Sequence, residues 1–358
     1  MSRISLVVAA LIVVDCLLAA YVVNPESPAP FPAVVPLGSP TAYLNTYLHV
    51  PIAWSALILF TAAFAASIAY LKTRKGFWDD FARSAVALGL AFGLATIVTG
   101  MAWAQESWGM AWNWDPKETA VLMLWLAYFG YYILRKSVTD PERVPVLAAT
   151  YAVAAFVLVP LSFGISMVVE SLHPGPAQTA AFYGRKTAAW VLASRSIIAT
   201  ALALTLAYAS AARKKLPVAL AVLALLLMAG VAAWPMAEYS GLVGRVVDAR
   251  VSELSGGEVS LEMTVLSGER EIPVRYSGPP PIRPLVVQMP GGGEAVSLVS
   301  HVVSVRGEEA EGAIEADEVK ILIHPCVPAT AAMHGAALAA SLLIARRGAG
   351  SRWTGERP

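Results

Sequence analysis

The sequence has little charge and almost no cysteine. Charged residues make up 14% of its 358 residues, whereas about a quarter of the residues of ordinary soluble domains are charged. The formal net charge of +1 gives no electrostatic basis for binding nucleic acid. The two cysteines, Cys16 and Cys326, lie near opposite ends of the chain and cannot build a disulfide framework or a zinc motif. No phosphate-binding loop motif is present, so any use of ATP would require another chain.

Long apolar runs take the place of charge. Hydrophobic residues make up 57% of the chain, and about twenty apolar residues suffice to span a bilayer. We therefore expect an all-α polytopic membrane protein with about eight transmembrane helices. The expected helices cover residues 4–23, 50–71, 83–103, 119–135, 145–170, 187–211, 216–236 and 327–345. The first run is longer than the apolar region of most signal peptides, so we expect it to be a retained helix.

Lysine and arginine are distributed unevenly between the connections. Short cytoplasmic loops are enriched in these residues, and the loops 72–83 and 135–143 and the C-terminal tail are rich in them. We therefore expect a multi-pass protein of the cell membrane with both termini in the cytoplasm. The connections expected outside are 24–49, 104–118, 171–186 and 237–326.

The last of these connections contains a segment of a different kind. Between Tyr239 and Ile323 the sequence becomes polar and strand-like, and apolar Val259, Leu261 and Met263 alternate with polar residues. Such alternation is typical of half-buried strands. Five or six short strands predict a small extracytoplasmic β-barrel inserted between the last two helices, and an OB-like barrel fits best.

These observations divide the chain into four parts. They are a six-helix membrane core (1–212), a linking transmembrane helix (213–238), the OB-like domain (239–323), and a C-terminal transmembrane helix with a basic cytoplasmic tail (324–358).

The densest aromatic cluster is "WGMAWNWDPKET", from Trp108 to Thr119. It has a purely structural interpretation, since tryptophan anchors membrane interfaces and Asp115 followed by Pro116 can begin a helix. Anchoring a helix at the membrane interface, however, needs only one or two aromatic rings. If a helical turn continued through the cluster, Trp108 and Trp112 would share one face. An aromatic surface beside a helix N-terminus suits a large planar ligand that carries carboxylates.

Haem is such a ligand, and its iron usually requires histidine. His49 in "TYLHVPIAW" and His173 in "ESLHPGPA" are expected on the same side of the membrane as the tryptophan cluster. A single interfacial histidine is more often a solvated surface residue. Two that flank one aromatic cluster favour axial ligation of iron.

The tryptophan cluster resembles the signature of the haem-handling family of cytochrome c maturation, which includes CcmC, CcmF and CcsA. "YLHVPIAW" and "SLHPGP" resemble the two external histidine segments of CcmC, over about residues 1–212. The resemblance implies a haem b site with His49 and His173 as iron ligands. The residues that it places around the haem are Trp108, Gly109, Trp112, Trp114 and Asp115. Ala111 replaces a further tryptophan of the CcmC pattern, and "WDPKET" is closer to CcsA or CcmF.

The second half resembles the haem chaperone CcmE. Its barrel begins "GLVGRVVD" and ends "GAIEADEVKILIHPC", where that family has a histidine or cysteine that attaches haem. His324 and Cys326 occupy this place, although the tyrosine that follows in the family is missing. His301 is expected to be structural. His334 lies inside the last helix and could contact haem or form a hydrogen bond between helices.

The resemblance implies a protein that binds haem at the outer surface and hands it on for cytochrome c maturation. Its expected partners are other maturation subunits, including an ATP-binding cassette complex, and indirectly apocytochrome c. The core needs no catalytic residue, so a haem-transfer protein is favoured over an enzyme. Two alternatives remain: a haem lyase of the CcsA or CcmF kind, and a membrane scaffold that binds no haem.

Overall fold

The computed structural model describes residues 2–32, 38–173, 175, 184–253, 257–288 and 293–348, so the expected tail beyond residue 348 lies outside the described part. The helical elements are α1 (Arg3–Val23), η1 (Pro40–Asn45), α2 (Thr46–Thr73), α3 (Gly76–Trp108), α4 (Pro116–Ser137), α5 (Arg143–Ala155), α6 (Leu158–Gly164), η2 (Ile165–Met167), α8 (Lys186–Ala211), α9 (Val218–Met236) and α10 (Cys326–Gly348). The strands are β1 (Leu242–Glu253), β2 (Val259–Ser267), β3 (Arg270–Gly278), β4 (Val286–Gln288), β5 (Glu294–Val296), β6 (Val302–Ala310) and β7 (Ala313–Ile321).

Seven helical segments of the described chain are long and apolar enough to cross a membrane. This confirms a multi-pass membrane protein. The structure therefore has seven such helices where about eight were expected, and the remaining expected span, 119–135, lies in α4, which packs beside α3 and α5. α4 is not among the seven, and it carries charged residues in its first and last turns.

The fifth expected span is divided into α5, α6 and η2 rather than forming one continuous helix. The division lies just before Pro160, which has no N–H to donate to the carbonyl of Phe156. The N–H of Val159 donates to that carbonyl instead, at 2.9 Å, and closes a tighter turn.

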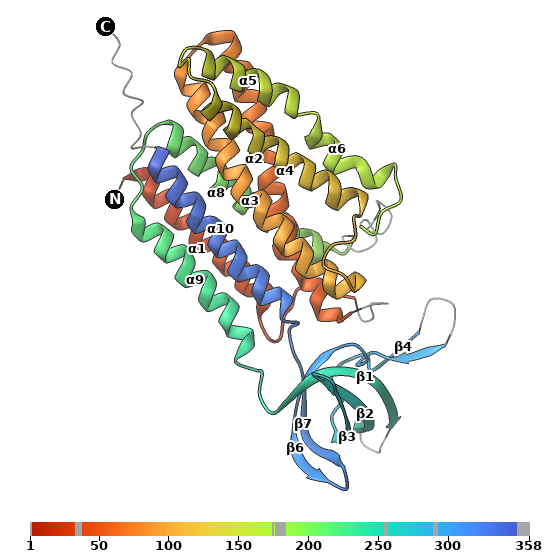
Figure 1. Ribbon diagram of the computed structural model, residues 1–358. Coiled ribbons are helices and arrows are strands. Elements are labelled where there is room, and N and C mark those ends of the chain that lie inside the picture. The colour runs from red at the N-terminus through yellow and green to blue at the C-terminus, as the bar shows by residue number, and fades with distance from the viewer. Residues whose placement is uncertain are drawn as a thin grey trace.

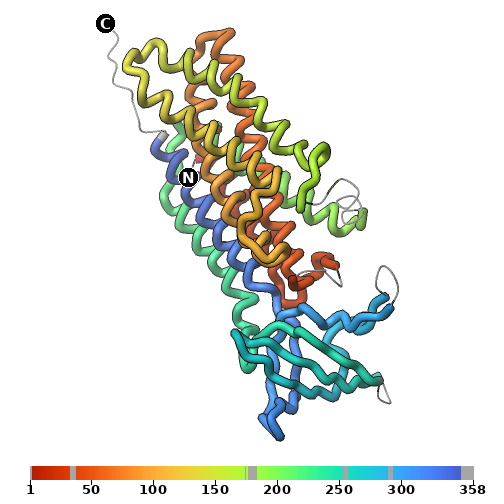
Figure 2. Tube along the Cα trace, turned by 45° about the vertical axis from the view of Figure 1, so that its right-hand side comes forward, coloured from red at the N-terminus to blue at the C-terminus, as the bar shows by residue number. Residues whose placement is uncertain are grey.

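The helices run side by side, and both views place their connections at two ends (Figures 1 and 2). One end carries the β-barrel, the turn between α3 and α4, and the start of α8. The other end carries the N-terminus, the end of α10, and the turn between α2 and α3. The tryptophan cluster and the barrel therefore lie at the same end of the molecule, which we call the barrel end.

The β-domain is a closed five-stranded barrel with the order β1-β2-β3-β7-β6, and β4 and β5 form a separate hairpin. β3 and β7 pair in parallel, while the other neighbours pair antiparallel. The predicted alternation is confirmed, because Val259, Leu261, Met263 and Val265 all point into the barrel core.

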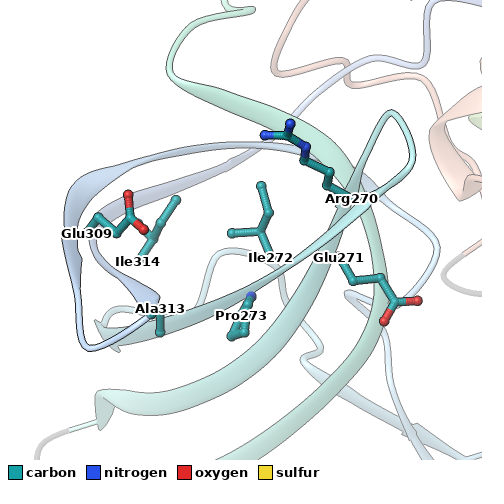
Figure 3. Close-up of a pocket in the computed structure, with 8 residues that line it drawn as sticks. Arg270, Glu271, Ile272, Pro273, Glu309, Ala313 and Ile314 are labelled. Carbon is teal, nitrogen blue, oxygen red and sulfur yellow. The ribbon is translucent and has the colours of Figure 1, made fainter.

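A cavity of about 500 Å³ opens on the barrel between β3 and the β6–β7 hairpin. Figure 3 shows Ile272 of β3 on the side of Ile314 of β7, while Pro273 extends from the other side of its strand. None of the site residues expected from the sequence lines this cavity.

Candidate functional site

The tryptophan cluster forms the turn between α3 and α4. α3 ends at Trp108 because Gly109 adopts a φ of 80°, the left-handed conformation that commonly ends helices. Trp112 therefore lies beyond the helix, and the expectation that a helical turn places Trp108 and Trp112 on one face is wrong. Trp114 also has a positive φ, of 55°, and its side chain is 73% exposed.

α4 begins as the sequence predicts. Asp115 is its N-cap and accepts a 2.9 Å hydrogen bond from the N–H of Lys117, and Pro116 occupies the first helical position. Glu118 accepts a 2.9 Å bond from the N–H of Asn113, which lies in the turn. The cap therefore fixes the turn as well as the helix.

The Asp115 carboxylate also holds the loop that carries His173. It accepts hydrogen bonds from the Ser171 hydroxyl at 3.0 Å, the Leu172 N–H at 2.7 Å and the His173 Nδ1–H at 2.9 Å. Burial raises the pKa of Asp115, but these bonds and the neighbouring histidine outweigh burial and hold its pKa below the ordinary value. Asp115 is thus a carboxylate that orients His173.

Burial lowers the pKa of His173 below its ordinary value, although Asp115 acts in the opposite direction. The ring is therefore neutral at pH 7, with its proton on Nδ1. A neutral imidazole with a free Nε2 lone pair is the form that binds a metal.

His49 lies on α2 and is held by α3. Its Nδ1 lies 2.8 Å from the Thr99 hydroxyl, and that hydroxyl donates its own proton to the Ala95 carbonyl at 2.7 Å. With its proton on that carbonyl, Thr99 accepts from His49 Nδ1–H, which leaves the lone pair on Nε2. A Cβ at Gly100 would lie 3.3 Å from the His49 ring, so the glycine keeps this face of α3 open for it.

The aromatic rings of the cluster do not lie in one plane. Trp108 meets His173 edge to face with ring centres 5.0 Å apart, and Trp112 meets Trp114 at 5.8 Å with an angle of 88° between their planes. The cluster therefore presents ring faces in more than one direction.

The two barrel candidates lie at the junction of the barrel and α10. His324 Nε2 lies 3.0 Å from Glu106 Oε2, and its Nδ1 accepts the Cys326 N–H at 3.3 Å. Cys326 is 7% exposed. Glu106 also accepts two bonds from Arg245 of β1, at 2.7 and 2.8 Å. Both ring nitrogens of His324 are therefore engaged, whereas His49 and His173 belong to other elements.

Several residues of this arrangement were not expected from the sequence. Thr99 and Gly100 carry no signal, because single small residues are common in membrane helices. Glu106 did carry one, since it is an ionisable residue within an apolar helix.

The structure thus defines a multi-pass helical membrane protein. At its barrel end it carries several tryptophans and two histidines whose rings are each hydrogen-bonded through Nδ1. Residues 1–173 match the family described as cytochrome C assembly protein, which confirms the CcmC-like resemblance for this segment. The matched segment contains the tryptophan cluster and ends at His173.

Curated relatives agree with this assignment. The chain is 33% identical over 115 residues to heme exporter protein C of Bradyrhizobium diazoefficiens, which is 32% of the chain and 44% of the relative. It is 31% identical over 130 residues to heme exporter protein C of Rhodobacter capsulatus, which is 36% of the chain and 54% of the relative. It is 39% identical over 88 residues to cytochrome c biogenesis protein CcsA of Thermosynechococcus vestitus, which is 24% of the chain and 27% of the relative. The matches span about half or less of each relative.

Proposed function

We propose that the protein binds haem b at the barrel end and hands it on in cytochrome c maturation, with His49 and His173 as the axial ligands. The observation that carries this proposal is the hydrogen bonding that the two rings share. The Nδ1 of His49 lies 2.8 Å from the Thr99 hydroxyl and the Nδ1 of His173 lies 2.9 Å from Asp115, which leaves each Nε2 for a ligand. Trp108, Gly109, Trp112, Trp114 and Asp115 are the proposed surroundings of the haem. Haem would supply a planar iron centre, while this chain supplies the axial nitrogens, the aromatic faces and the carboxylate that orients His173.

The set of donors favours haem over a bare metal ion. Within the described residues no three histidine, cysteine or acidic side chains form a group that could hold a metal. Two protein ligands alone make a weak site, whereas a porphyrin brings four nitrogens of its own and needs only axial partners.

The test is a haem titration of the purified protein in detergent. We expect saturable binding with the absorption and electron paramagnetic resonance of low-spin iron with two histidine ligands. A titration that shows only the spectrum of free haem in the same detergent would contradict the proposal and favour a scaffold without haem.

We propose that the barrel is CcmE-like and acts on the same haem, with His324 and Cys326 as the candidate acceptors. The order β1-β2-β3-β7-β6 with one parallel pair supports an OB-like topology. The barrel end would face outside, since the loops rich in lysine and arginine lie at the opposite end. Tethering would make the transfer intramolecular at high effective concentration. The partners would be other maturation subunits, including an ATP-binding cassette complex, and indirectly apocytochrome c.

A haem lyase of the CcsA or CcmF kind is the second candidate, because relatives named CcsA match the same segment. The family resemblance implies that a lyase of that kind carries paired intramembrane histidines, whereas here His334 forms a 2.6 Å bond to Asp15. That bond supports the helix-to-helix interpretation of His334 and favours a transfer protein over an enzyme.

The tryptophan faces make a separate prediction. Trp112→Ala and Trp114→Ala should each weaken haem binding about 2- to 10-fold, because one aromatic contact contributes about 0.5–1.5 kcal/mol. Trp234→Ala is the matched control, since Trp234 is 47% exposed on α9, away from the cluster. Equal losses in the haem titration for all three variants would show that the rings serve only as membrane anchors.

A further inference from the structure

Three ionisable side chains from three helices meet inside the helical core. Asp15 of α1, Arg195 of α8 and His334 of α10 have no exposed surface. His334 Nε2 lies 2.6 Å from Asp15 Oδ2, and Arg195 Nη1 lies 3.3 Å from Asp15 Oδ1. Ionisable groups inside a membrane are costly, and those that persist are usually paired and functional.

The cluster lies deep in the membrane-spanning part. Each of its residues is eight or nine positions from the barrel-side end of its helix. At about 1.5 Å per residue this is about 12–14 Å, close to the middle of a hydrocarbon core about 30 Å thick. The ion pair between Arg195 and Asp15 offsets the free-energy cost of burying these charges there.

Arg195 also reaches backbone carbonyls on two helices. Its Nη1 donates to the Asp15 carbonyl at 2.7 Å, and its Nε donates to the Tyr47 carbonyl of α2 at 2.9 Å. The planar guanidinium offers donors in a fixed fork, so this one side chain binds backbone carbonyls of both α1 and α2. Tyr47 is two residues before His49.

Pro51 explains why the Tyr47 carbonyl is bound in this way. In an α-helix the carbonyl of residue i accepts the N–H of residue i+4, and the partner of Tyr47 would be position 51. Pro51 lies inside α2, has no N–H, and its ring presses against that carbonyl. Arg195 provides the donor that the helix itself lacks, and His49 lies within the interrupted turn.

We propose that Arg195 is a positioning residue for His49. It replaces the hydrogen bond missing at Pro51, and Asp15 and His334 hold the guanidinium in place. The inference rests on the proposed role of His49 as an axial ligand.

The proposal gives α10 a part in the haem site. α10 follows the barrel and lies outside the segment that matches the family, residues 1–173. A Cβ at Gly335, next to His334, would lie 2.5 Å from Met228 of α9, so the two helices pack closely where the cluster forms. α10 thereby supports the turn of α2 that carries His49, the proposed axial ligand.

The experiment compares Arg195→Lys, Pro51→Ala and the double variant in haem titrations. Lysine keeps the charge opposite Asp15 but lacks the guanidinium Nε–H. We expect Arg195→Lys to raise the haem concentration at half-saturation about 10-fold or more, as for other groups that orient metal ligands, and to weaken the low-spin signal. Pro51→Ala restores an N–H at position 51, so it should change little alone and should return the double variant toward wild type.

Two further variants sharpen the test. Pro235→Ala removes the internal proline of α9 and should give no rescue of Arg195→Lys. His334→Gln retains a donor toward Asp15 and should bind haem better than His334→Leu.

The outcomes separate this inference from the proposed function. The positioning role is overturned if Arg195→Lys leaves the haem titration unchanged, or if Pro51→Ala does not reduce the loss of haem affinity caused by Arg195→Lys. Either result counts against this role alone when His49→Ala still abolishes the low-spin signal. If His49→Ala itself leaves that signal intact, the proposed axial ligation fails, and the positioning inference fails with it. The melting temperature of the haem-free protein is a second measurement. In this measurement Pro51→Ala should restore part of any decrease in melting temperature caused by Arg195→Lys. If the decreases of the two single variants simply add in the double variant, Arg195 does not replace the hydrogen bond missing at Pro51.

Discussion

Replacing both core histidines should abolish low-spin haem. We expect His49→Ala and His173→Ala each to shift the absorption maximum of the bound haem and to weaken binding, and the double variant to lose binding. Removing a group that merely orients a metal ligand typically costs about 10- to 100-fold in affinity, so removing the ligand itself should cost at least as much. The measurement is the haem titration with electron paramagnetic resonance of the ferric protein.

The contrast variant is His324→Ala. His324 is bonded to Glu106 at 3.0 Å and lies at the barrel junction, so its loss should leave the low-spin signal of the core unchanged. A normal signal in the His49 and His173 variants, together with loss in His324→Ala, would place the iron on the barrel instead.

Thr99→Val provides an intermediate case. It keeps His49 but removes the acceptor of its Nδ1–H, so the effect should be smaller than that of His49→Ala.

The sequence predicts those features that depend on neighbouring residues. The alternation at Val259, Leu261 and Met263 predicts barrel strands because side chains in a strand point alternately to its two faces. The spacing of Asp115 and Pro116 predicts the start of α4, because capping is a local interaction. Both features are present in the structure.

The contacts that complete the site depend on packing between distant segments. Asp115 and His173 are 58 positions apart in the chain, and no local pattern indicates that one orients the other. The break of α3 at Gly109 requires the left-handed conformation of one residue, which periodicity does not reveal. Asp15 and Arg195 are opposite charges inside apolar runs, and such charges indicate a buried ion pair. The sequence does not specify that His334 joins this pair.

Loss of Glu106 should separate the barrel from the core. Its carboxylate accepts bonds from Arg245, from the N–H of Ser39 at 2.6 Å and from the His324 ring. Glu106 is two residues before Trp108, so these bonds fix the barrel directly beside the tryptophan cluster. A hydrogen bond to a charged group contributes about 1.5–3 kcal/mol. Because about 1.4 kcal/mol corresponds to a tenfold change in an equilibrium, Glu106→Ala should increase the undocked population at least about tenfold.

Protease cleavage and hydrogen exchange at the junction of α9 and β1 measure this population. Glu315→Ala is the matched control, because Glu315 pairs with Arg275 at 3.0 Å on the exposed barrel surface, where an ion pair contributes little. We expect faster cleavage in Glu106→Ala and no change in Glu315→Ala. Equal rates in both variants would mean that the barrel is held by its other contacts.

The same variant tests whether docking controls the candidate acceptors. In the docked arrangement both ring nitrogens of His324 are engaged and Cys326 is buried, so neither is free to meet haem. Haem that is covalently attached survives a denaturing gel, whereas axially ligated haem does not. We expect haem staining to be stronger in Glu106→Ala than in the wild type, because His324 is released, and to disappear when the attaching residue is also replaced by alanine. If Glu106→Ala undocks the barrel and no variant stains, attachment at His324 or Cys326 is ruled out, and the barrel serves the core without a covalent intermediate.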